Sequence, residues 1–471
     1  MSWQTIVKEN KLAVAEIPFD EVLNINRLDA EYFDPFYLEQ DSVLNGKNLV
    51  PITQYIDISD GNHLSITEHF VEEGGVPYFR GQDVNNIFLN SASPMRISEE
   101  IYKKGWMKRS HFKANDILLS IVGTIGGLSF VPDDMGEASG SCKIAILRPK
   151  DTSFSKIVMV FLLGKYGQYQ LKRMTRGAVQ MGIILEDIPK IKIPNFSETI
   201  ASEVSHLISN VFESETLSRK RYEEAEQMLL KEINLEGYKG TEEAVSVRNF
   251  SEALSHNRFD AEYWQPDYDV ILDTLSSYKK GVSTIGDEFK QLKNNFKKDK
   301  EKEYSYIEIG DVNVSTGEVD RNIIIGAELP ANAKIKLGKR QLITSKVRPN
   351  RGATAILDDH EGYIGSGAFT VLTEQENINL ETLMVFLKMR PIRELLLRYN
   401  TGTSYPVITD ADVLKLPIPL IDKVVQKKIS ELVSESAKER QEAKALLEKA
   451  KRAVEIFVEK DEQSALKYLQ A

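Results

Sequence analysis

The sequence contains a single cysteine, Cys142, and six histidines among its 471 residues. One cysteine excludes an intramolecular disulfide and any zinc site that needs several thiolates. The closest histidines, His63 and His69, lack the i, i+4 spacing that places two ligands on one face of a helix. We therefore expect no metal site in this chain.

Long apolar runs are also missing. No run approaches the roughly 18 residues that a membrane-spanning helix requires. The first residues, MSWQTIVKENKLAVAEIPFDE, lack the basic region and apolar run of a secretory signal. We expect a cytoplasmic protein without a membrane partner. A net charge of −10 argues against indiscriminate coating of nucleic acid, although local basic patches remain compatible with it.

The chain does contain an internal repeat. Residues 26–37 read NRLDAEYFDPFY and residues 257–268 read NRFDAEYWQPDY, which is eight identities in twelve positions at a displacement of 231 residues. A repeat with this long a period indicates two copies of one domain. The sequence therefore predicts a tandem duplication.

Further segments repeat at a displacement of 225 residues. Residues 115–147 align without a gap to residues 340–372, and both read as strand, Gly-bearing turn, strand, Asp-Asp turn and strand. A helical stretch follows each, Phe161–Met174 and Phe386–Tyr399. A polar loop containing Gly177 or Gly402 then leads to a closing strand that ends at Pro194 or Pro419. Because proline cannot continue a central strand, each globular unit should end there.

Beyond each of these prolines the composition becomes rich in Glu and Lys. Residues 197–237 contain no internal Pro or Gly, Ser197 can act as the N-cap, and Gly237 can follow the C-terminus. We expect two long helices that pair antiparallel as a spacer; alternatively, each lies on its own globular unit. The second helix, residues 422–461, carries a stripe that steps by 3 and 4: Ile429, Leu432, Ser436, Glu439, Ala443, Leu446, Ala450, Ala453 and Phe457.

The predicted fold is α+β, with two tandem domains that are β-rich with short helices, separated by two long helices that pair as an antiparallel coiled coil. The predicted boundaries follow from the repeats and from the changes in composition. They are 1–196 for the first domain, 197–237 for the first helix, 238–420 for the second domain and 421–465 for the second helix.

This order of elements resembles the specificity (S) subunits of type I restriction–modification systems. The R-x-D-A-E-Y-x-x-P-x-Y element, the closing Gly-loop-to-Ile-Pro segment and the helix after each proline carry the resemblance, which extends over nearly the whole chain. It implies two target recognition domains that each read one half of a bipartite, asymmetric site in double-stranded DNA. It also implies that the helices set the gap and dock methyltransferase (M) subunits, two of them, and that restriction (R) subunits join later.

The resemblance further implies a non-catalytic subunit. S-adenosylmethionine, ATP and Mg would belong to the partner subunits, with no cofactor in this chain. The residues agree, since there is no G-x-x-x-x-G-K-[ST] loop. Asp34-Pro35-Phe36-Tyr37 is faintly similar to the D-P-P-Y motif of adenine methyltransferases, but its repeat counterpart at 265–268 lacks the first acid. Asp133-Asp134 is typical of a turn. We expect no catalytic residue.

DNA recognition needs cations for phosphate and amide, hydroxyl or guanidinium groups for base edges. Three sets of residues meet this requirement. They are the loop with Lys346, Arg348, Asn350 and Arg351, matched in the first half by Thr124; the loops after the helical stretches, with Lys172, Arg173, Arg176, Gln180, Tyr399, Thr401, Thr403, Ser404 and Tyr405; and the pair Arg80 and Gln82. The alternatives are a solvated basic turn for the first set and cations at a helix C-terminus for the second.

Two other functions remain open from the residues alone. One is a stand-alone nuclease or single-chain restriction enzyme with an unrecognised active site, and the other is a coiled-coil scaffold that binds only protein. The NRxDAEY element itself reads as structural: Arg27 with Asp29 or Glu31, and Arg258 with its equivalents, should form internal ion pairs. We expect its aromatic residues to pack each unit against the helix bases.

Overall fold

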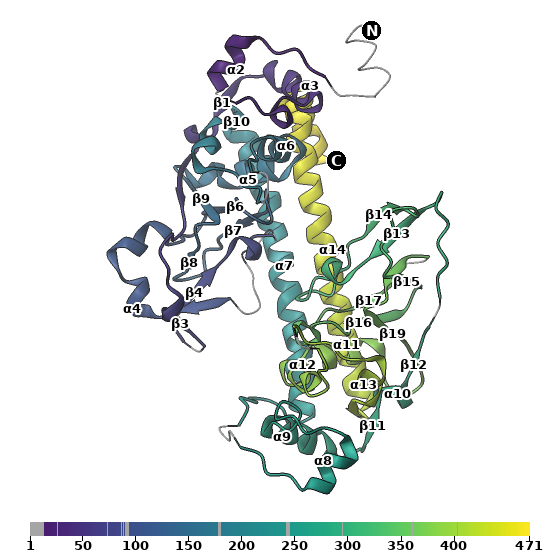
Figure 1. The fold of residues 1–471 in the computed structure, drawn as a ribbon. Helices are drawn as coiled ribbons and strands as arrows, with labels where there is room; N and C mark the ends of the chain where they lie inside the picture. Colours follow the sequence, from purple (N-terminus) through teal and green to yellow (C-terminus); the bar gives the residue numbers. More distant parts are fainter. Residues whose placement is uncertain are drawn as a thin grey trace. The chain divides into compact units, whose positions relative to one another are not determined.

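The computed structural model describes residues 14–25, 27–72, 74–85, 87, 89, 94–177, 180–241, 245–293, 295–358, 362–402 and 404–471. The chain forms two compact units (Figure 1). Unit 1 comprises Met1–Glu215 and Gln441–Ala471, and unit 2 comprises Thr216–Arg440. Both boundaries fall inside long helices, α7 (Glu198–Glu232) and α14 (Lys423–Glu459), so each unit contains one part of each helix.

The two units repeat the same antiparallel sheet. Its strand order is β2-β9-β6-β7 in unit 1 and β12-β19-β16-β17 in unit 2. The strands are β2 (Ile56–Asp60), β9 (Ile144–Pro149), β6 (Ile117–Ser120) and β7 (Leu128–Phe130), then β12 (Phe289–Gln291), β19 (Phe369–Glu374), β16 (Gln341–Ser345) and β17 (Thr354–Leu357). The duplication read from the sequence is therefore a duplication of the fold.

Each unit also has a second sheet, whose three central strands are equivalent in the two units and whose fourth strand is not. A parallel pair, β4 with β8 or β13 with β18, lies beside one antiparallel strand, β5 or β14. Unit 1 then adds β3 beyond β5, whereas unit 2 adds β15 beside β18. The strands are β3 (Phe70–Val71), β4 (Val76–Phe79), β5 (Met95–Ile97) and β8 (Ser139–Gly140), then β13 (Glu303–Ile307), β14 (Asn322–Ile325), β15 (Ala333–Lys336) and β18 (Ile364–Ser366).

A short two-stranded ladder closes each unit where the sequence predicted. In unit 1, β1 (Leu49–Pro51) pairs with β10 (Lys192–Pro194); in unit 2, β11 (Val282–Thr284) pairs with β20 (Pro417–Pro419). Each proline is the last residue of its closing strand, where no further ladder donor is needed. The long helix begins a few residues later.

Each predicted helical stretch is two helices rather than one. Unit 1 has α5 (Ser155–Leu163) and α6 (Lys165–Arg173), and unit 2 has α11 (Leu380–Lys388) and α12 (Arg390–Leu397). The breaks lie at Gly164 and Met389, whose ψ angles of 171° and 139° are extended. In unit 2, Pro391 then occupies the first turn of α12, where its missing N–H costs nothing.

The remaining helices of the described residues are short. They are α2 (Phe19–Ile25), α3 (Pro35–Asn45), α4 (Glu99–Tyr102) and α15 (Glu462–Gln470) in unit 1, and α8 (Phe250–His256), α9 (Pro266–Ser276), α10 (Ile285–Glu288) and α13 (Asp410–Lys415) in unit 2. None of the helices in this described part is long and apolar enough to cross a membrane.

The predicted antiparallel pairing of the long helices is present. In unit 2, the Ser218 hydroxyl donates to the Ser436 carbonyl and the Ser436 hydroxyl donates to the Ser218 carbonyl, both at 2.8 Å. Arg221, one turn further along α7, pairs with Glu435, which precedes Ser436, at 2.9 Å. Residue numbers therefore rise on one helix as they fall on the other, which defines the antiparallel direction.

The long helices also form part of each unit's core. Both arrangements considered from the sequence are therefore present: the helices pair with each other, and they also pack on the globular units. In unit 1, Ile200, Val204, Ala450 and Val454 share one buried apolar cluster with the strands and with α5. In unit 2, α7 and α14 join the corresponding cluster of that unit. Pairing leaves enough of each helix surface free to cover a globular unit.

The apolar residues of the stripe predicted on α14 are buried or, for Leu432, Leu446 and Phe457, partly buried against the cores of the units. Ser436, Ala443 and Ala450 are buried, whereas Glu439 remains half-exposed and Arg440 takes the buried position beside it. One guanidinium nitrogen of Arg440 donates there to the hydroxyls of Ser218 and Ser436, at 3.1 and 3.2 Å, and another donates to the Thr316 carbonyl at 3.2 Å. A buried guanidinium needs such partners to offset its desolvation.

The end of α7 differs from the prediction. Helix α7 stops at Glu232 rather than near Gly237, and Asn234 takes the left-handed conformation with φ of +57°. The Leu235 amide then donates to the Leu230 carbonyl at 2.9 Å, the pattern of a Schellman C-cap. Asparagine tolerates positive φ better than most other non-glycine residues, so Asn234 can end the helix before Gly237 is reached.

Candidate nucleic-acid interface

Two loops of unit 2, predicted as separate sets, lie side by side. The backbone of Val347 bridges that of Val407, the Arg348 amide donates to the Pro406 carbonyl at 2.7 Å, and the Ile408 amide donates to the Lys346 carbonyl at 2.9 Å. We call residues 346–352 and 399–408, apart from Thr403, the unit 2 loop pair. Thr403 lies outside the described residues.

Backbone geometry makes the first of these loops tight. Arg348 has φ of +51°, Pro349 begins a short 3-10 helix (Pro349–Arg351), and Gly352 has φ of +75°. A left-handed arginine is unusual and costs free energy. Backbone hydrogen bonds on both sides hold Arg348 in this conformation. Its carbonyl accepts from the Arg351 amide at 2.9 Å, and its amide donates to the Pro406 carbonyl.

The exposed side chains of the unit 2 loop pair are polar, cationic or aromatic. The Arg348 guanidinium lies 5.5 Å from the centre of the Tyr405 ring, which joins the two loops through a cation–π contact. Arg351 extends into solvent without an ion pair among the described residues. Asn350, Thr401 and Ser404 are exposed around them. Guanidinium, amide, hydroxyl and phenol groups are the types that contact phosphates and base edges.

Two other predicted residues of unit 2 point inward instead. Lys346 donates to Asp410 at 2.9 Å, and Thr370 donates to the same carboxylate at 2.7 Å. Burial alone would raise the pKa of Asp410, but these bonds bring it below its usual value. Tyr399 packs against the core and against Tyr263, and burial raises its pKa. Contacts within the unit account for Lys346 and Tyr399, so neither belongs to the exposed surface.

Unit 1 builds the same pair of loops. Val122 bridges Gly182, the Ile183 amide donates to the Ile121 carbonyl at 2.8 Å, and Arg176 bridges Gly182. We call residues 121–127 and 175–183, apart from Ala178 and Val179, the unit 1 loop pair. Its exposed polar residues from the prediction are Thr124 and Gln180, and Lys172 lies exposed just before it.

The third predicted set also lies beside the unit 1 loop pair. Arg80 precedes a short 3-10 helix (Gly81–Asp83), and a Cβ at Gly81 would be 3.0 Å from the Val122 carbonyl and 3.2 Å from the Lys143 side chain. Arg80 is exposed, and its Nε lies 3.4 Å from Oδ2 of Asp83. Gln82 is exposed beside it. Lys143, exposed in the same place, was missed, because its position between two strands carries no sequence signal.

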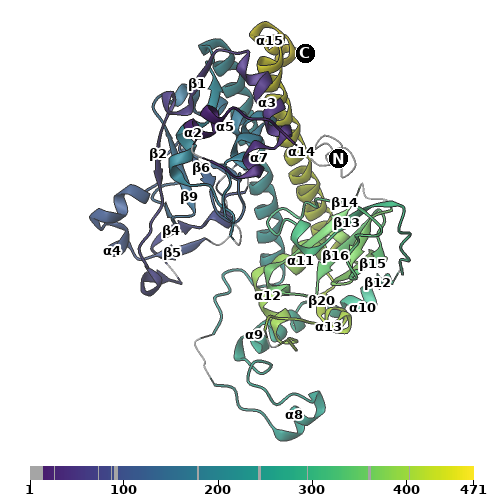
Figure 2. The ribbon, with the colours of Figure 1, turned by 45° about the horizontal axis from the view of Figure 1, so that its top comes forward.

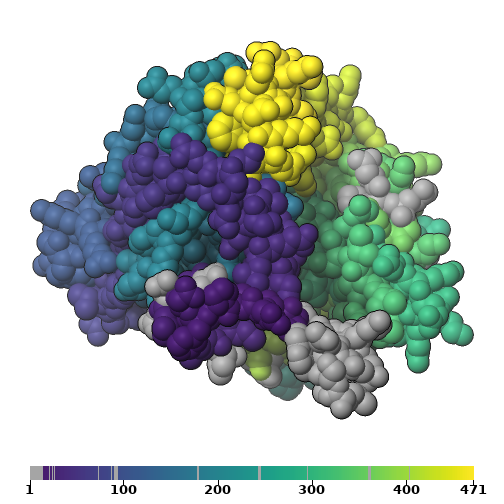
Figure 3. Space-filling view, turned by 90° about the horizontal axis from the view of Figure 1, so that it is seen from above, coloured from purple at the N-terminus to yellow at the C-terminus, as the bar shows by residue number. Residues whose placement is uncertain are grey.

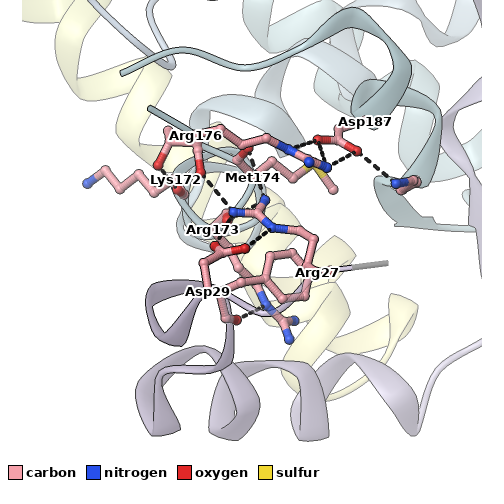
Figure 4. A network of polar contacts seen from close by, with 10 residues as sticks. Arg27, Asp29, Lys172, Arg173, Met174, Arg176 and Asp187 are labelled. Atoms are coloured by element: carbon pink, nitrogen blue, oxygen red, sulfur yellow. Dashed lines mark hydrogen bonds and ion pairs between the residues drawn. The ribbon is translucent and has the colours of Figure 1, made fainter. Parts of the chain in front are cut away.

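Arg173 and Arg176 have structural contacts (Figure 4). Arg173 is buried, pairs with Asp41 and donates to the Tyr32 carbonyl at 2.7 Å. Arg176 makes two bonds to the buried carboxylate of Asp187, at 2.9 and 3.0 Å. Lys172 instead points away from this network in Figure 4. Of these three cations, only Lys172 is presented outward.

The repeated NRxDAEY element holds this region in place. Arg27 pairs with Asp29 and donates to the carbonyls of Met174 and Thr175, at 3.3 and 3.0 Å, just beyond the end of α6. The Tyr32 ring lies under two guanidiniums, 4.4 Å from that of Arg27 and 4.2 Å from that of Arg173. The N-terminal element thus clamps the loop that follows α6.

Unit 2 repeats this clamp. Arg258 pairs with Asp260 at 2.6 Å and donates to the Asn400 carbonyl at 3.2 Å, and the Arg398 guanidinium lies 4.4 Å from the Tyr263 ring. The predicted internal Arg–Asp pairs are confirmed, with Asp rather than Glu as the partner. The aromatic residues nearest them differ from the prediction, because they face arginines at the end of α6 or α12 rather than the helix bases.

No group of three or more His, Cys, Asp or Glu side chains in the described ranges could hold a metal ion.

In sequence, residues 279–449 match the family model described as "Type I restriction modification DNA specificity domain". The matched residues, most of which lie in unit 2, are similar to the DNA specificity domain of type I restriction–modification systems. The match includes the whole unit 2 loop pair, and the fold repeat extends the same architecture to unit 1.

Similar solved structures include the type I restriction–modification S subunit from M. genitalium, at 15% identity and a TM-score of 0.39, covering 88% of this chain and 96% of that one. Another is the HsdS subunit from Thermoanaerobacter tengcongensis, at 12% identity and a TM-score of 0.27, covering 90% and 96%. A third comes from work on assembly and conformational transition of the type I R-M system, at 12% and 0.29, covering 88% and 98%. No curated protein matches the sequence significantly.

Proposed function

We propose that each unit of this specificity protein reads one half of a bipartite, asymmetric DNA site through its loop pair. The observation that carries this proposal is the duplication itself. The same sheet, the same clamp and the same two joined loops occur twice, yet the exposed side chains of the loops differ. A common scaffold with different loops is the arrangement expected for reading two different sequences.

The two surfaces offer different chemistry. Unit 2 presents Arg348, Asn350, Arg351, Ser404 and Tyr405; arginine pairs well with guanine, and asparagine with adenine, in the major groove. Unit 1 presents Arg80, Gln82, Thr124, Lys143, Lys172 and Gln180, with fewer guanidiniums and more amide groups. We expect the two half-sites to differ in sequence for this reason.

The proposal includes partner proteins. Two methyltransferase subunits and, later, restriction subunits would join this chain in the cytoplasm, where they would supply S-adenosylmethionine-dependent methylation and ATP- and Mg-dependent cleavage. The long helices offer exposed faces for such subunits, since Lys438 and Ala445 are exposed on α14.

Methylation mapping of host DNA with and without the gene tests the proposal directly. We expect a new methylated motif with two unlike halves and a fixed gap. The decisive control is a chain with its unit 2 loop pair replaced by alanines, which should change or abolish one half of the motif and leave the other. A continuous or palindromic motif would contradict the split reading.

Single substitutions test individual contacts. We expect Arg348→Ala and Arg351→Ala each to weaken binding of the assembled complex to the mapped site by about 1–3 kcal/mol, or roughly 5- to 150-fold, as for loss of a specific arginine contact. Lys279→Ala, an exposed lysine of the same unit outside the loop pair, is the matched control. Equal effects of all three on fluorescence-anisotropy titrations would show that only net charge matters.

A further inference from the structure

In each unit, one side chain reaches from the second short helix to the first loop of the loop pair. In unit 1, Nε2 of Gln168 on α6 donates to the Gly126 carbonyl at 3.0 Å. In unit 2, Nη1 of Arg393 on α12 donates to the Asn350 carbonyl at 3.1 Å. Gln168 and Arg393 are equivalent in the repeat, displaced by 225 residues, and each is the fourth residue of its helix. Two different side chains therefore hold the backbone of the first loop in the same way.

A glycine allows each of these side chains to lie against the loop. Gly126 has φ of +82° and Gly352 has φ of +75°, a conformation that favours glycine. A Cβ on Gly126 would lie 2.9 Å from Oε1 of Gln168, and a Cβ on Gly352 would lie 2.8 Å from Cδ of Arg393. Both distances are too short for a real Cβ contact. Close packing and the hydrogen bond together fix the separation between the loop and the helix.

The helices that carry the two side chains are anchored in their own units. In unit 2, Ile392 and Leu395 of α12 are fully buried, and α12 lies next to α11 (Figure 2). In unit 1, the Tyr169 hydroxyl of α6 donates to the Gln40 carbonyl at 3.2 Å. Figure 3 shows the purple N-terminal residues, which include Gln40, packed against the teal part of unit 1. A side chain on an anchored helix can hold a loop in place because its own backbone has little freedom.

The two hydrogen bonds lie beside the side chains that the loops present. The Asn350 carbonyl is between Arg348 and Arg351, and the Gly126 carbonyl is two residues beyond Thr124. Recognition groups must be held to within about 0.5 Å of their productive geometry, which a loop achieves only when other residues support it.

We infer that Gln168 and Arg393 are positioning residues, each of which holds the first loop of its own unit in the conformation that reads a half-site. They act through the loop backbone and need no contact with DNA. This inference rests on the proposed function and adds to it the residues that give each loop its shape.

The test is base discrimination by the complete complex, measured separately for the two halves of the mapped site. Fluorescence-anisotropy titrations use the mapped duplex and two duplexes in which one half is scrambled. Gln168→Met and Arg393→Met remove the donor and keep a long unbranched side chain. Each should reduce the discrimination against one scrambled half by about 5- to 150-fold, the range for a lost base contact, and leave the other half unchanged. The two variants should affect different halves.

Two controls come from the same helices. Gln170→Met removes a buried glutamine of α6 that donates to the Lys192 carbonyl of the closing strand at 2.9 Å. Arg390→Met removes an exposed arginine of α12 that pairs with Glu394. Both should keep the discrimination of both halves, whatever their melting temperatures. Arg393→Lys, which retains a charged donor, should recover part of the discrimination that Arg393→Met loses.

Three results would overturn the inference. One is loss of discrimination in both halves together with a lower melting temperature, as for a merely structural residue. Another is equal weakening on all three duplexes by Arg393→Met with a salt-dependence slope smaller by about 0.9, which would show a direct phosphate contact. The third is wild-type discrimination in both methionine variants, which would leave the proposed function intact. A wild-type complex that discriminates against neither scrambled half would overturn the proposed function itself.

Discussion

Basic residues that are neighbours in the sequence differ in burial: one is exposed, and the other is buried in contacts within its unit. Lys172 and Arg173 are adjacent, yet Lys172 is exposed while Arg173 is buried against Asp41 and the Tyr32 carbonyl. Arg348 and Lys346 differ in the same way two residues apart. A basic residue in these loops can therefore support the loop from inside the unit instead of facing solvent.

We expect Arg173→Ala to lower the free energy of unfolding of unit 1 by about 3 kcal/mol, because it leaves a partly buried carboxylate and a carbonyl without their donor. Lys172→Ala should change it by less than about 0.5 kcal/mol, as for an exposed residue. Chemical denaturation of both variants checks this. Similar stabilities, with DNA binding lost only in Arg173→Ala, would return Arg173 to the interface.

A buried lysine should make stability depend on pH. Lys388 is the last residue of α11 and is buried; it donates to the Ser315 carbonyl at 3.2 Å, and its Nζ lies 4.9 Å from the ring centre of Tyr222 on α7. Burial lowers its pKa to about 7; Arg440 and Arg393 also lower it, and Glu226 raises it. Between pH 7 and the usual lysine pKa of 10.5, the unfolded chain binds a proton that the folded chain does not.

Stability should therefore rise with pH across this window, since the state that binds more protons is disfavoured as pH increases. From pH 7 to pH 9 we expect the wild type to gain about 2 kcal/mol relative to Lys388→Met, which has no proton to lose. Denaturant titrations of both proteins at each pH give the difference. Parallel pH profiles would mean that Lys388 stays charged when folded.

At the scale of elements, the long helices combine two tasks. Their serines and alanines allow close antiparallel approach, as at Ser218 and Ser436, while Ile200, Val204 and Val454 cover a unit's core. The heptad pattern predicts the first task correctly. The second follows from apolar positions outside that stripe, which a single heptad assignment ignores.

The pairing face of α14 should be sensitive to charge. Ala450 is fully buried in the core of unit 1, so Ala450→Lys should destabilise that unit by at least about 3 kcal/mol, because it forces a long cationic side chain into a packed site. Ala445→Lys, on an exposed face of the same helix, is the control and should be close to neutral. Equal loss of melting temperature in both variants would contradict the observed packing.

At the scale of the whole molecule, unit 1 is assembled from both ends of the chain. Residues 441–471 contribute Ala443, Ala450, Val454, Val458 and Ala465 to its core, in a cluster with residues from 44 to 211. Unit 2 is continuous from Thr216 to Arg440. The sequence boundaries 1–196 and 238–420 describe the repeat, whereas the compact units also include the helix parts.

A chain that ends at residue 440 should therefore lose unit 1 and keep unit 2. Removing residues 441–471 uncovers apolar residues of α7 such as Val204 and Ile208, which are buried in the full chain. Limited proteolysis should cut within residues 1–215 of the truncated chain and spare residues 216–440. Protection of both units at full-length levels would show that unit 1 does not depend on the C-terminal segment.

The sequence by itself determined the duplication, the β-rich units, their closing prolines and the antiparallel helix pair, because repeats, turn residues and heptads are local or periodic signals. Only the tertiary structure decided which cations face outward, that two distant loops join into one surface in each unit, and that unit 1 needs the C-terminus. Those outcomes depend on contacts between residues far apart in the chain, such as Arg173 with Asp41 and Lys346 with Asp410. No local pattern encodes such pairs, so burial and partner choice emerge only when the chain is folded.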